Sequence, residues 1–160
     1  MGAGRQHGRV ARLLIVHHTP SPAMAELLDA AVTGAQVPEI TGVEVVRRAA
    51  LSAGPADVLA ADAVLLGTPA NIGYMSGALK HFFDVVYYPV LDDTRGLPYG
   101  LYVHGNLDTA GAITAVETIT GGLGWQRVAP PVEVHGQPDA AARAAVAELA
   151  ATLAATVMPD

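Results

Sequence analysis

Short apolar runs alternate with amphipathic stretches along nearly the whole chain. Runs of four to eight residues rich in branched side chains are typical of strands buried in a parallel sheet, whereas longer stretches with a 3.6-residue apolar period are typical of helices. The runs predict five strands, at Val10–Val16, Gly42–Arg48, Ala63–Leu66, Pro98–Val103 and Arg127–Val134. The intervening stretches predict five helices, at Pro22–Val32, Ala56–Ala61, Ser76–Tyr88, Thr109–Ile119 and Pro138–Val157.

Residues with known terminal preferences mark the ends of these helices. Ser21 is a good N-cap and Pro22 suits the first helical position. Gly34 is expected to end the first helix, and the pair Gly121–Gly122 the fourth, because glycine readily takes the left-handed conformation found at helix ends.

Strict alternation of strand and helix predicts an α/β fold: a five-stranded parallel sheet with helices on both faces. The 160 residues suit one domain, expected over residues 10–157 after a flexible tail at residues 1–9. Pro130 and Pro131 place the last strand at an edge of the sheet, because proline cannot donate to the strand ladder. Trp125 suits either the core or an interface.

Composition narrows the class of protein. Hydrophobic residues make up 51% of the chain, which is ample for a buried core. The formal charge is −6 and there is no basic cluster beyond Arg47–Arg48, so nucleic-acid binding is not expected. No apolar run is long enough to span a membrane, and the run that follows the polar N-terminus is too short for a signal peptide. The absence of cysteine excludes disulfides and thiol catalysis, and a cytoplasmic location is the default expectation.

Candidate chemistry lies in three segments that follow the first, third and fourth strands. In open α/β sheets, ligands bind beyond the carboxyl ends of the strands. The first segment, His17–Met24, leads directly into a helix N-terminus, whose free N–H groups and partial positive charge attract phosphate. Thr19 and Ser21 would add hydroxyl donors. The alternative is an ordinary turn in which Ser21 caps the helix.

The second segment, Thr68–Gly77, holds two glycines, a proline and an asparagine. Its backbone N–H groups could face a flat heterocycle, with Ile72 and Tyr74 covering the faces of the ring. The alternative is a plain loop in which Ser76 caps the next helix.

The third segment, His104–Thr109, is expected at the same edge. Asn106 and Asp108 could hydrogen-bond a polar ring edge or the hydroxyls of a sugar chain. The alternative is a capped helix start, with Asp108 or Thr109 as the cap.

Metal and hydrolase chemistry are both disfavoured. His17 and His18 are adjacent at a strand end, so their side chains point in opposite directions, and no carboxylate lies next to them. Ser21 has proline on both sides and lacks the glycine-flanked elbow of a nucleophilic serine.

The segment LLGTPANIGYMSGALKHFFD, Leu65–Asp84, resembles the second flavin loop and following helix of flavodoxin-like NAD(P)H-dependent FMN reductases, including quinone reductases of the WrbA type. Val10–Ala35 resembles the phosphate-loop unit of that family, and Tyr99–Trp125 resembles its third flavin loop and helix. In all, the resemblance covers roughly residues 10–155.

This resemblance implies a flavodoxin-like, doubly wound five-stranded sheet in the order 2-1-3-4-5, FMN as cofactor, NADPH or NADH as electron donor, and a homodimer or tetramer. No catalytic side chain is expected, because such a cofactor would carry the chemistry. The positions that match flavin-binding positions of the family are Thr19, Ser21, Ala23 and Met24 in the first segment, Pro69, Ala70, Asn71, Ile72 and Gly73 in the second, and His104, Gly105, Asn106 and Asp108 in the third.

The first segment departs from the family. Pro20 and Pro22 lack an N–H, and Met24 and Glu26 stand where hydroxyl side chains are common in the family. Fewer donors remain for a phosphate, so a modest affinity for FMN is expected.

Three functions remain open. The first is an FMN-binding, NAD(P)H-dependent oxidoreductase that passes electrons to a flavin, a quinone or a similar small acceptor. The second is a flavodoxin-type electron-transfer protein that exchanges electrons with a redox protein, although the mild negative charge disfavours docking by electrostatic steering. The third is a flavin-free binding protein on the same fold.

Overall fold

The computed structural model describes residues 9–160, so residues 1–8 of the expected tail lie outside the described part of the chain. The strands are β1 (Ala11–His17), β2 (Val43–Ala49), β3 (Ala63–Asn71), β4 (Tyr74–Met75), β5 (Pro98–Gly105), β6 (Gln126–Arg127) and β7 (Val132–His135). The helices are α2 (Pro22–Ala35), α3 (Pro55–Leu59), α4 (Gly77–Val90), α5 (Ala110–Leu123) and α6 (Ala140–Thr156).

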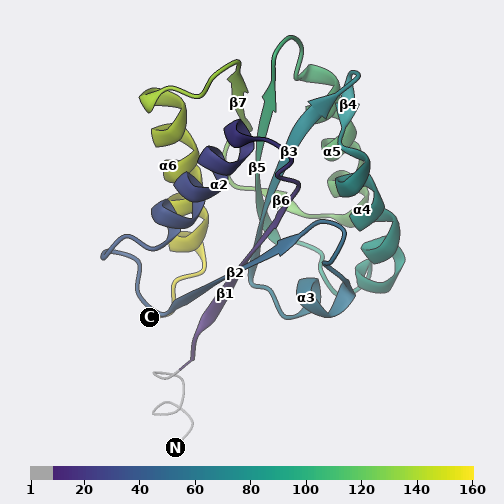
Figure 1. Cartoon of the computed structure of the whole chain (residues 1–160). Helices are drawn as coiled ribbons and strands as arrows, with labels where there is room; N and C mark the ends of the chain where they lie inside the picture. Colours follow the sequence, from purple (N-terminus) through teal and green to yellow (C-terminus); the bar gives the residue numbers. More distant parts are fainter. Residues whose placement is uncertain (1–8) are drawn as a thin grey trace, which may run out of the picture.

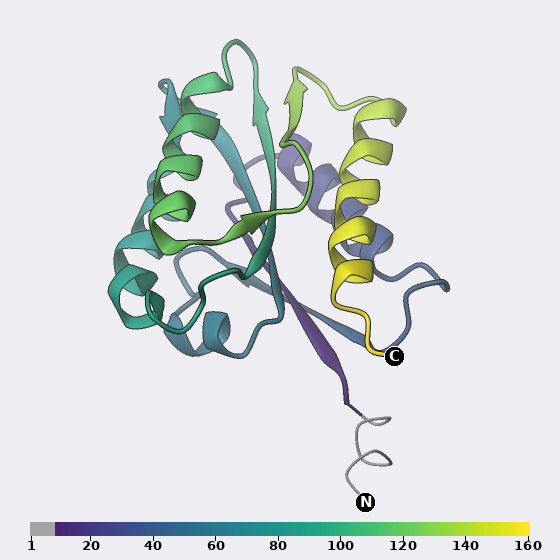
Figure 2. The same cartoon turned by 180° about the vertical axis from the view of Figure 1, so that it is seen from behind.

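A parallel sheet forms the middle layer, and helices cover both of its faces, as predicted. Its path runs β2-β1-β3-β5-β6. Helices α2 and α6 lie on one face, and α3, α4 and α5 lie on the other (Figures 1 and 2). In the register of the sheet, His17 of β1 lies beside Gly67 of β3, which lies beside Tyr102 of β5.

The number and order of strands differ from five strands in the order 2-1-3-4-5. The expected fifth strand is divided: β6 pairs with the start of β5, and β7 pairs with its end. Pro130 and Pro131 lie in the gap, where their missing N–H groups prevent continuous pairing. The additional strand β4 pairs with β3 in an antiparallel hairpin.

Strand β3 runs five residues beyond the predicted end at Leu66. Gly67 pairs with both neighbouring strands, and Thr68 and Pro69 pair with β5, so tertiary pairing extends a segment whose composition favours a loop. The expected second loop is therefore mostly a β-hairpin that projects from the carboxyl edge of the sheet.

Two glycine signals for helix ends are wrong for the same reason. Gly34 lies inside α2, where an added Cβ would come within 2.1 Å of the backbone oxygen of Ala147 in α6. Gly122 lies inside α5, where a Cβ would meet the Tyr87 hydroxyl at 2.4 Å. Both glycines permit close helix contacts, and α5 ends instead at Gly124, which has a left-handed φ of 73°. The end of α4 also differs from the prediction, because the helix continues past Tyr88 to Val90.

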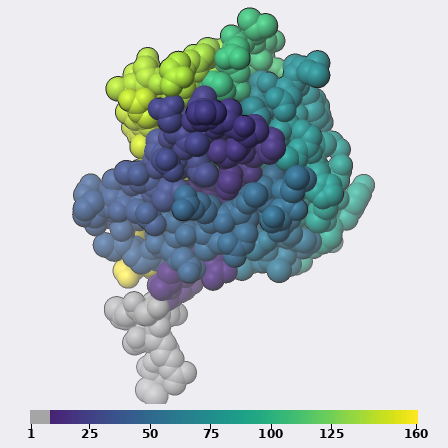
Figure 3. Space-filling view, viewed as in Figure 1, coloured from purple at the N-terminus to yellow at the C-terminus, as the bar shows by residue number. Residues whose placement is uncertain are grey.

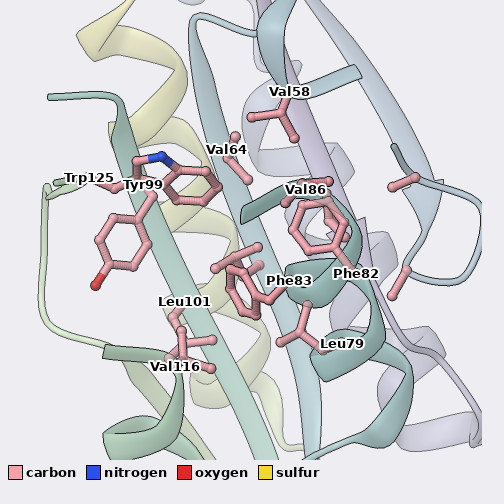
Figure 4. Close-up of a cluster of buried hydrophobic side chains, with 14 of the residues drawn as sticks. Val58, Val64, Leu79, Phe82, Phe83, Val86, Tyr99, Leu101, Val116 and Trp125 are labelled. Atoms are coloured by element: carbon pink, nitrogen blue, oxygen red, sulfur yellow. The ribbon is translucent and has the colours of Figure 1, made fainter. Parts of the chain in front are cut away.

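Each face of the sheet has its own buried core. The core under α3, α4 and α5 includes the predicted apolar stripe Leu79, Phe82, Phe83 and Val86 (Figure 4). Trp125 belongs to this core, 6% exposed, and its indole N–H donates to the Thr94 hydroxyl at 2.9 Å. The core under α2 and α6 contains Leu13, Ile15, Met24, Leu65 and Tyr102 among its buried residues.

Candidate functional site

The three predicted segments meet at the carboxyl edge of the sheet, at the ends of β1, β3 and β5 (Figure 1). In the space-filling view, the purple atoms at the start of α2 lie next to the teal hairpin and the green β5–α5 turn (Figure 3). The backbone ties the first segment to the residue that precedes the second, because the His18 N–H donates to the Gly67 carbonyl at 3.0 Å.

The turn between β1 and α2 is a capped helix start. The Ser21 hydroxyl accepts from the Met24 N–H at 3.2 Å, which confirms Ser21 as the cap. Pro22 has no N–H to offer, so the Ala23 N–H is the one first-turn donor of α2 that makes no hydrogen bond within the described residues. Thr19 adds a hydroxyl, which shares a 2.7 Å hydrogen bond with Nδ1 of His17.

His17 is half-buried at the end of β1, and its environment lowers the pKa of the imidazole. Burial is the main cause, since it penalises the charged ring, and the positive charges of Arg47 and His18 act in the same direction. At neutral pH the imidazole that shares this hydrogen bond with the Thr19 hydroxyl is therefore uncharged.

The β3–β4 hairpin turns at Ile72 and Gly73, both of which have positive φ, 50° and 74°. Two consecutive positive φ values suit the right-handed twist of a two-residue hairpin. The base of the hairpin is held by the Ser76 N–H, which donates to the Thr68 hydroxyl at 3.0 Å. Ser76 also caps α4 by accepting from the Leu79 N–H, as the alternative interpretation predicted.

The β5–α5 turn approaches the hairpin closely. A Cβ on Gly111, in the first turn of α5, would lie 2.0 Å from the Gly73 carbonyl oxygen, and a Cβ on Gly105 would lie 3.3 Å from the Ala70 Cβ. The absence of a side chain at Gly111 is what permits this contact between α5 and the hairpin. The Asp108 carboxylate accepts from the Ala110 N–H at 2.9 Å, so Asp108 serves the helix start.

A pocket of about 320 Å³ lies between the hairpin and the β5–α5 turn. Its lining includes six of the thirteen predicted site residues. The seventh lining residue is Leu107, which the sequence analysis missed although it stands between two candidates. The lining residues are Ala70, Ile72, Gly73, Gly105, Asn106, Leu107 and Asp108.

The other predicted site residues do not line this pocket. Pro69 is buried within β3, and Asn71 is exposed opposite Tyr74 in the hairpin. The side chain of Met24 is fully buried in the core, so only its backbone lies at the turn. Nε2 of His104 donates to the Gly136 carbonyl at 2.7 Å. Thr19, Ser21 and Ala23 lie in the β1–α2 turn, at the same edge of the sheet.

Glu133 and His135, which were not predicted from the sequence, contact the Thr109 hydroxyl at the start of α5 with their side chains. Their alternation with Val132 and Val134 places them on one side of β7, and that alternation was the available signal. Within residues 9–160, no group of three His, Asp or Glu side chains is arranged to hold a metal ion. No helix in this range is both long and apolar enough to cross a bilayer.

The parallel sheet, its two helical layers and the ligand-sized pocket at the carboxyl edge define a flavodoxin-like fold. Solved structures with this fold align along nearly the full chain. They include a WrbA-like flavodoxin from Agrobacterium tumefaciens, with TM-score 0.74 and 16% identity over 91% of this chain and 96% of the other. A flavodoxin from the domain Archaea gives TM-score 0.77 and 14% identity over 91% and 98%. A Streptococcus pneumoniae flavodoxin gives 0.74 and 19% over 92% and 100%. No family model and no curated protein matches the sequence.

Proposed function

We propose that residues 10–157 form one FMN-binding domain and that the protein is an NAD(P)H-dependent oxidoreductase, which passes electrons to a flavin, a quinone or a similar small acceptor. The observation that carries the proposal is the pocket between the β3–β4 hairpin and the β5–α5 turn. It stands at the edge where open α/β sheets bind ligands, and residues of two predicted flavin segments line it.

The ring end of a flavin suits this pocket. Ile72 and Leu107 offer apolar side chains, and Ala70, Gly73 and Gly105 leave the backbone open to a flat ring. Such a lining, apolar with a few polar groups, is typical of cofactor pockets. A volume of about 320 Å³ is small for a whole FMN, so the ribityl phosphate would extend outward.

The phosphate end suits the start of α2. The Ala23 N–H, the positive end of the helix dipole and the Thr19 hydroxyl would hold a phosphate there. The Ser21 hydroxyl is partly occupied by capping, and two prolines remove donors, which supports a modest affinity.

FMN, when bound, supplies the acceptance and release of hydride and single electrons. The chain's own side chains would bind and orient the ring and exclude water from it. Asp108 is the one titratable residue that lines the pocket, and its carboxylate caps α5. We therefore assign no catalytic side chain.

The test is to load the purified protein with FMN and to add NADPH or NADH without oxygen. Bleaching of the flavin absorbance, followed by reoxidation with a quinone, is the expected result. Protein that binds FMN but keeps its yellow colour with both nucleotides would contradict the oxidoreductase proposal.

A flavodoxin-type electron carrier is the second candidate, and the exposed pocket rim favours it. Leu107 is 89% exposed and Ile72 is fully exposed, so apolar side chains surround the pocket where a redox protein would dock. A carrier would take electrons from a reductase protein and would not be bleached by NADPH alone.

We also propose a cytoplasmic homodimer or tetramer. Val85 and Tyr88 on α4 expose apolar surface, with Tyr88 81% exposed. Tyr88→Glu should reduce the molar mass measured by light scattering. An unchanged mass, or a monomeric wild type, would remove α4 as the interface.

A further inference from the structure

The short edge strand β7 contacts the candidate site through its side chains as well as its backbone. His135 lies beside Gly105 in the parallel register, and the Gly136 N–H donates to the Gly105 carbonyl at 3.1 Å. In return, His104 donates from Nε2 to the Gly136 carbonyl at 2.7 Å. One end of the pocket-lining turn is thereby attached to residues 135–136.

The other end of the turn is attached through Thr109. Its hydroxyl donates to the Glu133 carboxylate at 2.5 Å, since a carboxylate only accepts. The same oxygen lies 3.3 Å from Nε2 of His135, and because its one proton is already committed, it accepts from the Nε2–H. Thr109 thus joins a carboxylate and an imidazole on alternate positions of β7.

This arrangement is more than a helix cap. Thr109 occupies the N-cap position of α5, yet its side chain makes no capping hydrogen bond, and Asp108 binds the Ala110 N–H instead. The Thr109 side chain is 1% exposed, and its methyl group would lie 3.2 Å from a Cβ on Gly105. The Thr109 methyl group therefore packs against Gly105, which lines the pocket, and its hydroxyl is directed to β7.

We propose that Thr109, held by Glu133 and His135, is a positioning residue that keeps residues 105–108 in the geometry that binds the flavin ring. The inference rests on the proposed function for its ligand, but the attachment of the turn to β7 can be measured without any ligand. It adds three residues to the site that do not contact the ligand themselves.

The central variant is Thr109→Val, which keeps the shape and removes the hydroxyl. Thr109→Ser restores the hydroxyl and should restore the wild-type behaviour. Thr120→Val is the matched control: Thr120 is equally buried in α5, but its hydroxyl bonds to Tyr99 at the opposite end of the helix.

Two readouts separate positioning from general stability. The first is NMR amide exchange at Gly136 and Ala110, which donate to Gly105 and Asp108. The second is the Kd for FMN and for riboflavin, which lacks the phosphate. Thr109→Val should accelerate exchange at both amides. It should also raise the Kd for FMN and the Kd for riboflavin by about tenfold each. The ratio of the two Kd values should stay unchanged, because the turn faces the ring and not the phosphate. Thr120→Val should lower the Tm by about as much as Thr109→Val does, but it should alter neither the amide exchange nor the Kd values.

Each outcome decides the matter. Unchanged exchange in Thr109→Val would overturn the positioning role, whatever the flavin affinity. If the wild type binds flavin, faster exchange in Thr109→Val without a change in its Kd values would also overturn the positioning role. If the wild type binds neither flavin, the proposed function fails and the exchange data alone decide whether Thr109 holds the turn. Should Thr109→Val not fold, Glu133→Leu at an exposed position removes the acceptor and is measured in the same way.

Discussion

Ile72 holds a left-handed φ of 50° although its side chain branches at Cβ, and it is fully exposed at the tip of the hairpin. Branched residues rarely adopt this conformation, whereas asparagine adopts it readily. A residue under strain at a pocket rim is retained at a cost in stability, which is consistent with a role in binding. At Ile72, therefore, the stability of the fold and the proposed binding of a ligand compete.

Replacing Ile72 separates these two effects. Ile72→Asn should raise the free energy of unfolding by about 1 kcal/mol, because the turn loses its strain, and should weaken FMN binding, because the pocket loses an apolar side chain. Urea denaturation and flavin fluorescence quenching measure the two effects. Ile72→Val keeps the branched Cβ and serves as the control; a loss of stability in the asparagine variant would contradict the strain argument.

Tyr102 is fully buried beside Gly67, and its hydroxyl is the one buried side-chain polar atom within residues 9–160 that lacks a partner. Burial raises the pKa of this phenol well above its usual range. Tyr102→Phe should leave stability unchanged or raise it by about 1 kcal/mol, since no hydrogen bond is lost. Tyr99→Phe should lower stability by about 1 kcal/mol, because the Tyr99 hydroxyl bonds to Thr120. Denaturation curves in which Tyr102→Phe is the less stable variant would show that the hydroxyl has a partner.

His17 predicts a pH dependence of stability. Burial, then the positive charges of Arg47 and His18, lowers its pKa in the folded state below the ordinary histidine value of 6.5. The unfolded chain therefore binds more protons below that pH, so the free energy of unfolding falls as the pH drops through 6.5 toward the folded pKa. Urea midpoints at about pH 7.5 and about pH 5.5 should differ less in His17→Gln than in the wild type. Equal differences would remove His17 as the cause.

At the scale of elements, glycines distinguish what local preference favours from what packing requires. A glycine in a long amphipathic stretch predicts a helix end, yet Gly34 and Gly122 lie within helices. The deciding contacts, with Ala147 and Tyr87, come from residues far along the chain, so no local signal could show them.

Two glycine substitutions should therefore have opposite signs. Gly121→Ala meets no atom within 4 Å and should stabilise the fold by roughly 0.5–1 kcal/mol through helix propensity. Gly34→Ala would place Cβ against the Ala147 backbone and should destabilise it by about 1–3 kcal/mol, because α2 and α6 must separate. Thermal melts of both variants provide the test, and two shifts of the same sign would contradict the packing argument.

The candidate site shows the same division. The three segments at the carboxyl edge, the Ser21 and Ser76 caps and most of the pocket lining follow from the order of elements and from short-range capping. The direction of His104 and the contacts of β7 depend on pairing between strands that are distant in the chain.

The whole molecule joins the two ends of the proposed ligand site across β1, β3 and β5. FMN at about 100 times its Kd should add about 2.7 kcal/mol to the free energy of unfolding, which corresponds to a rise in Tm of roughly 5–10 °C. Riboflavin should give less at the same concentration, because it lacks the group that the α2 N-terminus would hold. AMP, which carries a phosphate without a flavin ring, is the control. A shift with AMP equal to that with FMN would mean that the pocket does not recognise the ring.

The sequence by itself determined the alternation of strands and helices, the apolar faces that pack them, and the edge of the sheet where three loop-like segments gather. These features follow from periodicity and capping, which act over a few residues. Only the tertiary structure decided how far β3 extends, that two prolines divide the last strand, and that glycines lie inside α2 and α5. It also decided which candidate side chains face the pocket and that Glu133 and His135 hold Thr109. Those outcomes depend on contacts between residues distant in the chain, which become specific only when the sheet has assembled.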